Sequence, residues 1–248
     1  MSSQMHNAIF FNTYSLSERA ISVVFGSDID DSTLQQITQF NHTLHRKPFP
    51  GFYTTVPAYT TLTVFYDPLL VIQSDLPGTD CFDKVTHYLE QLKQHLAQDQ
   101  PGLGKMITIP VCYGGTFGPD LKYVAASHGF TTDKVIDLHS SAIYKVYMIG
   151  FVPGFAYLGG MPEVLATPRL TTPRKAIPTG SVGIAGKQTG VYPLDTPGGW
   201  QLIGRTPLAL FAASRSQPAL LQAGDTIKFE PIPHHEFDLY RHHADTHH

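Results

Sequence analysis

Glycine and proline are distributed very unevenly along this chain of 248 residues. Residues 101–233 hold 18 of the 21 glycines and 14 of the 19 prolines, whereas the first 100 residues hold three and five. A segment so rich in both residue types must place much of its backbone in turns, bulges and corners. The contrast predicts a domain boundary at residues 100–104, with one domain over 1–103, a second over 104–233 and a tail over 234–248.

The composition excludes several classes of protein. With 42% hydrophobic residues, 15% charged residues and a net charge of −3, the chain has neither the signature of intrinsic disorder nor the basic charge of a nucleic-acid-binding protein. No run of 18 apolar residues predicts a transmembrane helix, and the first residues lack the pattern of a secretory signal. Two cysteines in a chain of this length do not make a disulfide framework. We therefore expect a cytoplasmic protein.

The first 100 residues alternate between strand-like and helix-like segments. Asp30 and the two residues after it are candidate N-caps of a helix that runs through about residue 44. Thr79 or Asp80 is a candidate N-cap of a second helix, whose apolar residues recur at helical spacing to Leu96. The order βαββαβ predicts a ferredoxin-like α+β domain. Its predicted strands cover residues 20–25, 51–56, 60–65 and 106–111.

The second part of the chain has a different texture. Two short helices are predicted to begin near Pro119 and Thr131. After them come short apolar runs between glycines and prolines, and only residues 207–213 have a helical period. These features predict a small, heavily cornered β-barrel or sandwich, so the expected fold class is α+β. The tail holds six of the 13 histidines without a ligand spacing, and we expect it to be frayed, with no metal site.

The densest group of candidate functional residues lies in residues 180–205. This segment contains seven glycines, the single tryptophan Trp200, and the polar residues Lys187, Gln188 and Arg205. Glycine lets backbone N–H groups approach an anion closely. However, the glycine spacing matches neither a P-loop nor a dinucleotide-binding fingerprint. Barrel corners and bulges are the structural alternative.

A second candidate segment is rich in aromatic residues. Phe151, Phe155 and Tyr157 stand among glycines and a proline, and could form a wall for a flat ligand or a partner chain. A small barrel core would use the same residues. Just beyond them, Arg169 and Arg174 follow prolines, and a guanidinium group is suited to binding carboxylate or phosphate. Solvated charges on turns are the alternative.

Six ordered motifs between residues 111 and 232 carry a resemblance to a known family. They are VCYGGTFGPDL (111–121), GFVPGFAYLGGMP (150–162), ATPR (166–169), IPTGSVGIAGKQTGVYP (177–193), TPGGWQLIGRTP (196–207) and LQAGDTIKFEPI (221–232). The chain resembles the family of the B subunit of 5-oxoprolinase over about residues 8–232. The same family is known as allophanate hydrolase subunit 1, as the KipI-type inhibitor of a sporulation histidine kinase, and as carboxyltransferase domain, subdomain C and D.

The resemblance implies a ferredoxin-like N-terminal domain and a cyclophilin-like β-barrel C-terminal domain. It implies one component of a cytoplasmic, hetero-oligomeric enzyme that opens the lactam of 5-oxoproline to L-glutamate while it hydrolyses ATP, with Mg²⁺ as the usual companion of ATP. The implied partners are the C subunit of 5-oxoprolinase, in direct contact, and the A subunit, with no nucleic acid and no membrane. Inhibition of a histidine kinase and an accessory role in allophanate hydrolysis are the alternatives.

The resemblance also supplies candidate site residues at matching positions. The chemistry requires cations for an anionic substrate and phosphate, and donors for a developing oxyanion. Lys187 stands where glycine looks common in the family. The candidate catalytic residues are Arg174, Gln188 and Arg205; the candidate substrate- or phosphate-binding residues are Gly183, Gly186, Lys187 and Tyr192; and the candidate aromatic wall or partner contacts are Phe151, Phe155 and Trp200.

Overall fold

The computed structural model describes residues 9–28, 30–96 and 104–240. The chain divides into two compact units, Met1–Leu103 and Gly104–His248. Apart from Gly104, the boundary segment predicted at residues 100–104 lies outside the described residues. Within the described part of the chain, every helix is too short or too polar to cross a lipid bilayer. Cys81 and Cys112 are both free thiols, the first half-buried and the second buried.

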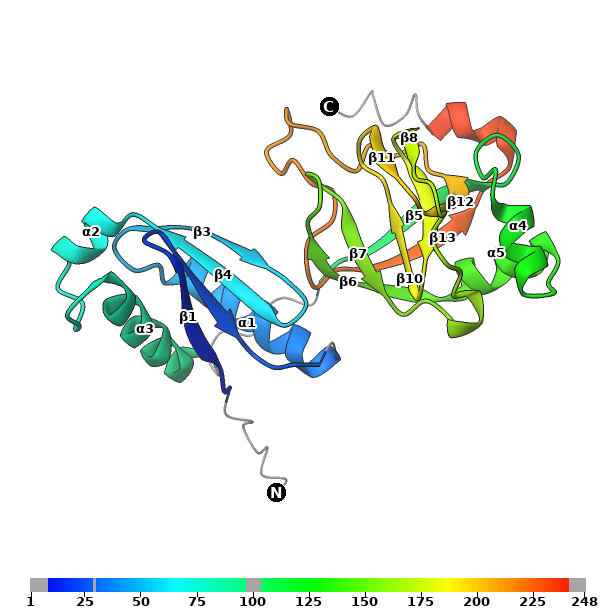
Figure 1. The fold of residues 1–248 in the computed structure, drawn as a ribbon. Helices are drawn as coiled ribbons and strands as arrows, with labels where there is room; N and C mark the ends of the chain where they lie inside the picture. Colours follow the sequence, from blue (N-terminus) through cyan, green and yellow to red (C-terminus); the bar gives the residue numbers. More distant parts are fainter. Residues whose placement is uncertain (1–8, 29, 97–103, 241–248) are drawn as a thin grey trace, which may run out of the picture. The chain divides into compact units, whose positions relative to one another are not determined.

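The N-terminal unit is a four-stranded antiparallel sheet with helices packed on one face (Figure 1). The strands are ordered β1-β2-β4-β3. The helix α1 connects β2 to β3, and β4 lies between these two strands in the sheet. This arrangement is the split βαβ unit of ferredoxin-like sheets. The elements are β1 (Asn12–Ser17), β2 (Ala20–Val24), α1 (Asp31–Arg46), β3 (Phe52–Pro57), β4 (Thr61–Tyr66), α2 (Pro68–Gln73), α3 (Cys81–Leu92) and the short 3₁₀ helix η1 (Lys93–His95).

Local capping chemistry starts both long helices of this unit where the sequence predicts. The Asp30 carboxylate accepts a hydrogen bond from the Thr33 N–H at 2.8 Å, and Asp80 does the same for Asp83 at 2.8 Å. Apolar residues of both helices and of the sheet then form one core. Its fully buried members include Ile21, Val23, Ile37, Phe40, Leu44, Leu62, Val64, Val85 and Leu89.

The prediction that residues 106–111 form the closing strand of the ferredoxin-like unit is wrong. Residues 106–111 belong to β5 (Met106–Tyr113), which pairs within the barrel of the second unit, parallel to β13 (Thr226–Pro231). The sheet position that this strand would have taken is filled by β1, which pairs antiparallel with β2. The sequence of β1 has no apolar alternation because most of its side chains are exposed at the sheet edge. The observed element order is therefore ββαββαα.

The C-terminal unit is a closed barrel of seven strands, with a separate two-stranded sheet, β11-β8. The strand order around the barrel is β10-β7-β6-β13-β5-β12-β9. The mixed α and β architecture with a barrel confirms the coarse fold prediction. The remaining elements are α4 (Leu121–Ser127), α5 (Thr132–Ser141), β6 (Ile143–Ile149), β7 (Ala156–Gly159), η2 (Glu163–Leu165), β8 (Arg174–Ile177), β9 (Ser181–Ala185), β10 (Gln188–Val191), β11 (Thr196–Gly198), β12 (Gln201–Arg205) and η3 (His234–Glu236).

The structure corrects two local predictions in this unit. Residues 207–213 are not helical, because the segment pairs with the chain that returns beside it: Ala212 N–H donates to Pro218 O, and Leu220 N–H donates to Leu210 O, both at 2.8 Å. The start of the predicted frayed tail is packed, since Phe237 is buried and its ring stacks on Phe117 at 4.3 Å. Residues 241–248 of that tail lie outside the described residues.

Candidate functional site

Strands β9 and β10 form a wall whose two faces differ. Val182, Ile184 and Val191 pack inside the barrel. On the other face, Gly183 and Gly190 leave room for large rings: a Cβ atom at Gly190 would lie 3.1 Å from both Phe155 Cζ and Trp200 Cζ3. The alternation of side chains along a strand thus places two glycines under an aromatic cluster. That cluster contains Phe155, Ile177, Ala185, Tyr192, Trp200 and Leu202.

A pocket of about 330 Å³ opens beside this cluster, and we call it the aromatic pocket. Its rings meet edge to face, with Phe155 at 5.5 Å from both Tyr192 and Trp200 and at 4.9 Å from Tyr157. Such packing holds the walls in fixed orientations. The lining residues are Phe151, Phe155, Tyr157, Arg169, Pro173, Tyr192, Pro197, Gly198, Gly199 and Trp200.

Tyr192 brings a hydroxyl group to the pocket. A Cβ atom at Gly198 would lie 2.6 Å from Tyr192 Oη, so any larger residue at position 198 would collide with the hydroxyl in its present place. Burial raises the pKa of Tyr192 to about 12, although a hydrogen bond from the Trp200 backbone and the charges of Arg169 and Arg174 act in the other direction. The phenol therefore keeps its proton at neutral pH and can donate a hydrogen bond.

Phe151 stands at the rim of the pocket in a strained conformation. Its φ is 68°, and it is the one residue other than glycine with positive φ in the part of the chain described here. Its side chain is 64% exposed, and its ring lies 5.6 Å from that of Phe155. The predicted aromatic wall is thus brought together, with Phe155 and Trp200 as buried walls and Phe151 as an exposed edge.

Arg174 lies beside the pocket but does not line it. Its Nη2 donates to both carboxylate oxygens of Asp120, at 2.7 and 2.9 Å, and its Nη1 donates to the Trp200 carbonyl at 3.2 Å. Asp120 also accepts a hydrogen bond from the Leu202 N–H at 2.6 Å. This half-buried ion pair ties strand β8 to the barrel and fixes the backbone of Trp200.

The glycine-rich hairpin is not part of the pocket. Gly186 and Lys187 form its two-residue turn, and Gln188 begins β10 opposite Ala185. The Gly186 N–H donates to Thr167 O at 2.7 Å, and Lys187 Nζ lies 2.7 Å from Glu163 Oε1. The structure therefore separates these three predicted site residues from Tyr192 and the aromatic wall.

Two other predicted residues also lie elsewhere. Gly183 is buried between β10 and β12, and its carbonyl accepts a hydrogen bond from Thr189 Oγ1 at 3.0 Å. Arg205 ends β12, and its Nε donates to the Thr179 carbonyl at 2.7 Å. Neither residue lines the aromatic pocket. The roles predicted for them stay predictions.

Arg169, which the sequence indicated either as a group suited to carboxylate or phosphate or as a solvated charge on a turn, lines the pocket. Its guanidinium group is exposed at the pocket, and it is the only charged group of the lining. Gly198 was not among the predicted site residues, whereas Tyr157, which the sequence predicted as part of the aromatic wall, lines the pocket. The motif ATPR, which carries part of the resemblance and predicts a charge on a turn, already contained Arg169. The sequence lacks a signal for the packing that brings residue 169 beside Trp200.

A buried polar chain crosses the inner side of the same wall. His139 is fully buried; its Nδ1 lies 2.7 Å from Tyr113 Oη and its Nε2 lies 2.9 Å from Thr189 Oγ1. Since Thr189 donates to Gly183 O, its oxygen accepts from the His139 Nε2–H, and Nδ1 accepts from Tyr113. Burial lowers the pKa of His139 to about 3, so the imidazole is neutral and structural.

The aromatic pocket does not fit a magnesium ion. Its lining has no carboxylate, and the one charged residue is the cation Arg169. Among the described residues, no three His, Cys, Asp or Glu side chains gather as metal ligands would. The residues of this pocket therefore do not provide a magnesium site.

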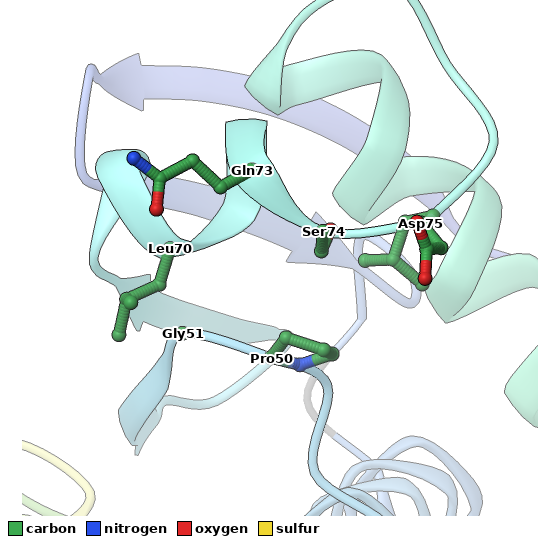
Figure 2. A pocket seen from close by; sticks show the side chains of 7 residues that line it. Pro50, Gly51, Leu70, Gln73, Ser74 and Asp75 are labelled. Atoms are coloured by element: carbon green, nitrogen blue, oxygen red, sulfur yellow. The ribbon is translucent and has the colours of Figure 1, made fainter.

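A second hollow, of about 650 Å³, lies in the N-terminal unit (Figure 2). Leu70 and Gln73 reach it from α2, and Pro50 and Gly51 form the opposite side. None of the predicted site residues belongs to it, and its lining has no aromatic or cationic side chain. The aromatic pocket is therefore the candidate site.

Comparisons with known proteins agree with the resemblance in the sequence. The family model described as carboxyltransferase domain, subdomain C and D, matches residues 11–221. A Bacillus subtilis protein named as the B subunit of 5-oxoprolinase is 45% identical over 91% of this chain and 95% of its own length. A Haemophilus influenzae protein of the same name is 54% identical over 61% of this chain and 72% of its own length.

A solved structure extends this similarity to the fold. The crystal structure of TTHA0988 aligns with a TM-score of 0.73 and 33% identity over 86% of this chain. The aligned region spans 40% of that longer chain. In that protein, more than half of the polypeptide lies outside the region that resembles this chain.

Proposed function

The chain belongs to the family of carboxyltransferase domains, subdomain C and D, and from this premise we propose that it is the B subunit of an ATP-dependent 5-oxoprolinase. The observation that carries the proposal is the 45% identity to a protein of that name over nearly the whole of both chains. In the proposed reaction, the cyclic amide of 5-oxo-L-proline is hydrolysed to L-glutamate, and ATP is hydrolysed to ADP and phosphate.

The chemistry explains why ATP is required. The carbonyl carbon of a lactam is a poor electrophile because the ring nitrogen donates electron density to it. Transfer of the γ-phosphoryl group of ATP to the carbonyl oxygen releases ADP and makes the carbonyl carbon a better electrophile. Water then adds to that carbon, the bond to the ring nitrogen breaks as the nitrogen takes up a proton, and an acyl phosphate is formed. A second water molecule hydrolyses the acyl phosphate to the carboxylate and free phosphate. Such a reaction needs a site that holds an anionic substrate and excludes competing water.

The aromatic pocket provides groups for binding rather than for proton transfer. Its buried rings fix the walls, Tyr192 offers a hydroxyl and Arg169 offers a cation. We therefore propose that this chain acts in a hetero-oligomer with the A and C subunits, in the cytoplasm, and that ATP with Mg²⁺ binds at the level of that complex. We also propose that the barrel of the C-terminal unit is of the cyclophilin-like type.

The test is 5-oxoproline-dependent ADP release by the material that co-purifies with this chain from its own cells. The control is the chain expressed and purified alone. We expect activity in the co-purified fraction and none in the control, because the site is shared between the components of the complex. Stable partners without any stimulation by 5-oxoproline would overturn the proposal and favour a regulatory binding protein that acts on a histidine kinase.

A further inference from the structure

We propose that the aromatic pocket binds a compact cyclic amide that carries a carboxylate, with the ring against the wall formed by Phe155 and Trp200 and the carboxylate at Arg169. This inference rests on the proposed function, because 5-oxo-L-proline is a molecule of this class. It goes further by assigning the substrate to one pocket of this chain. The similarity to the relatives does not select this pocket; its choice rests on the lining residues and their charge.

The first argument is the charge of the pocket. Of its ten lining residues, only Arg169 is charged. In the part of the chain that the structure describes, the guanidinium group of Arg169 has no carboxylate partner and makes no hydrogen bond. Arg174, by contrast, is already paired with Asp120. A ligand with one carboxylate would complete the pairing of Arg169, with the two parallel hydrogen bonds that guanidinium and carboxylate groups form.

The second argument is the size and nature of the walls. A volume of about 330 Å³ stands at the low end of the roughly 300–1,000 Å³ of small-molecule pockets, which suits a ligand of a single ring. Phe155 and Trp200 are nearly fully buried and meet edge to face at 5.5 Å, so they form a fixed apolar wall. The methylene groups of a small saturated ring can pack against such surfaces.

The third argument is a second polar group in the lining, the hydroxyl of Tyr192. The Tyr192 hydroxyl accepts a hydrogen bond from the Trp200 backbone, and it retains its own proton for donation. An amide carbonyl oxygen is the natural acceptor. Arg169 would then bind the carboxylate of the ligand, and Tyr192 would donate a hydrogen bond to its lactam carbonyl.

The single tryptophan of the chain makes the proposal directly measurable. Because Trp200 is the single tryptophan and lines the pocket, a change in its fluorescence when a ligand is added to the folded chain reports on this site. The experiment is a titration of the full chain with 5-oxo-L-proline. The comparison ligands are 2-pyrrolidinone, which lacks the carboxylate, and L-proline, which lacks the lactam carbonyl. We expect saturable binding of 5-oxo-L-proline and at least tenfold weaker binding of both others.

Two variants identify the role of Arg169. Arg169→Gln should weaken the binding of 5-oxo-L-proline at least tenfold and should leave that of 2-pyrrolidinone unchanged. Lys134→Gln removes an exposed cation of the same unit, on α5, and serves as the matched control with wild-type binding. Equal affinity of Arg169→Gln and the wild type for 5-oxo-L-proline would overturn the proposal. So would binding of L-proline as tight as that of 5-oxo-L-proline.

If the isolated chain gives no fluorescence change, the kinetics of the co-purified complex test whether 5-oxo-L-proline binds in the aromatic pocket. The proposal requires that Arg169→Gln raises the KM for 5-oxo-L-proline at least tenfold, while the KM for ATP stays constant. An active complex with an unchanged KM for 5-oxo-L-proline would overturn the pocket assignment and leave the proposed function intact. A wild-type complex without 5-oxoproline-dependent turnover would overturn the proposed function instead, and, together with the absence of a fluorescence change, it would overturn the pocket assignment as well.

Discussion

The two faces of the wall formed by β9 and β10 differ in what they leave available. On the inner face, Tyr113, His139 and Thr189 form a chain of hydrogen bonds that ends at the Gly183 carbonyl, and each polar group has its partner. On the outer face, glycines make room for aromatic rings, and Arg169 faces a pocket. A strand of a few residues thus supports a closed structural network on one side and a binding surface on the other.

The largest expected effect comes from filling the outer face. Gly190→Val places a Cβ atom 3.1 Å from Phe155 Cζ and Trp200 Cζ3, and the two methyl groups come closer still. Because both rings are buried and fixed by their neighbours, we expect the variant to lose about 3 kcal/mol of unfolding free energy, the upper range for overpacked cores. Denaturant unfolding followed by Trp200 fluorescence measures this directly.

A substitution at the tip of the same hairpin is the control for that variant. Gly186 has φ of 57° with open space around its Cβ position, and asparagine tolerates this conformation. Gly186→Asn should cost less than about 1 kcal/mol. If Gly190→Val were equally mild, the aromatic cluster would have a second packing arrangement, and the contrast between the two faces would be lost.

The buried His139 on the inner face should make the stability of the barrel depend on pH. The pKa of His139 is about 3 in the fold and 6.5 in an unfolded chain, so between these values only the unfolded state binds the proton. Stability therefore falls as the pH is lowered, by about 2 kcal/mol from pH 7 to pH 5 for this one group. Unfolding curves at several pH values, again read from Trp200, measure the slope.

The variant His139→Gln isolates the contribution of this group. It keeps a donor toward Thr189 but cannot titrate, so its stability should vary less with pH over the same range. His45 also has a pKa lowered by burial, but it lies in the other unit, which has no tryptophan. An unchanged slope in His139→Gln would show that another group dominates the acid sensitivity of the barrel.

The sequence predicted those parts of the fold that depend on local chemistry. Asp30, Asp80 and Thr131 cap helices as expected, because a cap needs only the residues of the next turn. The sequence-based prediction failed for β5, which pairs with β13 and so joins residues 120 positions apart. No local pattern indicates which sheet such a strand joins. The prediction missed β1 because an exposed edge strand has no apolar alternation.

The difference between local and long-range features also explains which site residues could be predicted. Phe151, Phe155 and Trp200 stand out in the sequence because large rings beside glycine and proline are unusual, and the structure brings them together. Lys187 and Gln188 also stood out, but their place at the tip of a hairpin depends on the register of β9 and β10. Arg169 could not be selected over Arg174 from the sequence, because only the position of Asp120 shows which guanidinium is already paired.

The paired arginine provides a third prediction. Arg174 and Asp120 are half-buried, with side chains 29% and 14% exposed, whereas Lys187 and Glu163 are 73% and 78% exposed. Arg174→Gln should therefore lose about 1.5 kcal/mol of unfolding free energy, between the values for exposed and buried pairs. Lys187→Gln should not change stability measurably. Equal stabilities of the two variants would mean that Arg174 does not hold β8 against the barrel.

The smallest expected effect concerns the strained rim of the pocket. Phe151 has φ of 68°, a conformation that costs every residue with a Cβ atom about 1 kcal/mol relative to glycine. Phe151→Gly and Phe151→Ala both remove the ring, but only glycine relieves the strain, so the glycine variant should be more stable by about 1 kcal/mol. If the ring covers a bound ligand, both variants should weaken the Trp200 response to 5-oxo-L-proline equally, which separates the role of the side chain from that of the backbone. A glycine variant that is no more stable than the alanine variant would show that the loop relaxes without the ring, and that the ring itself imposes the strained conformation.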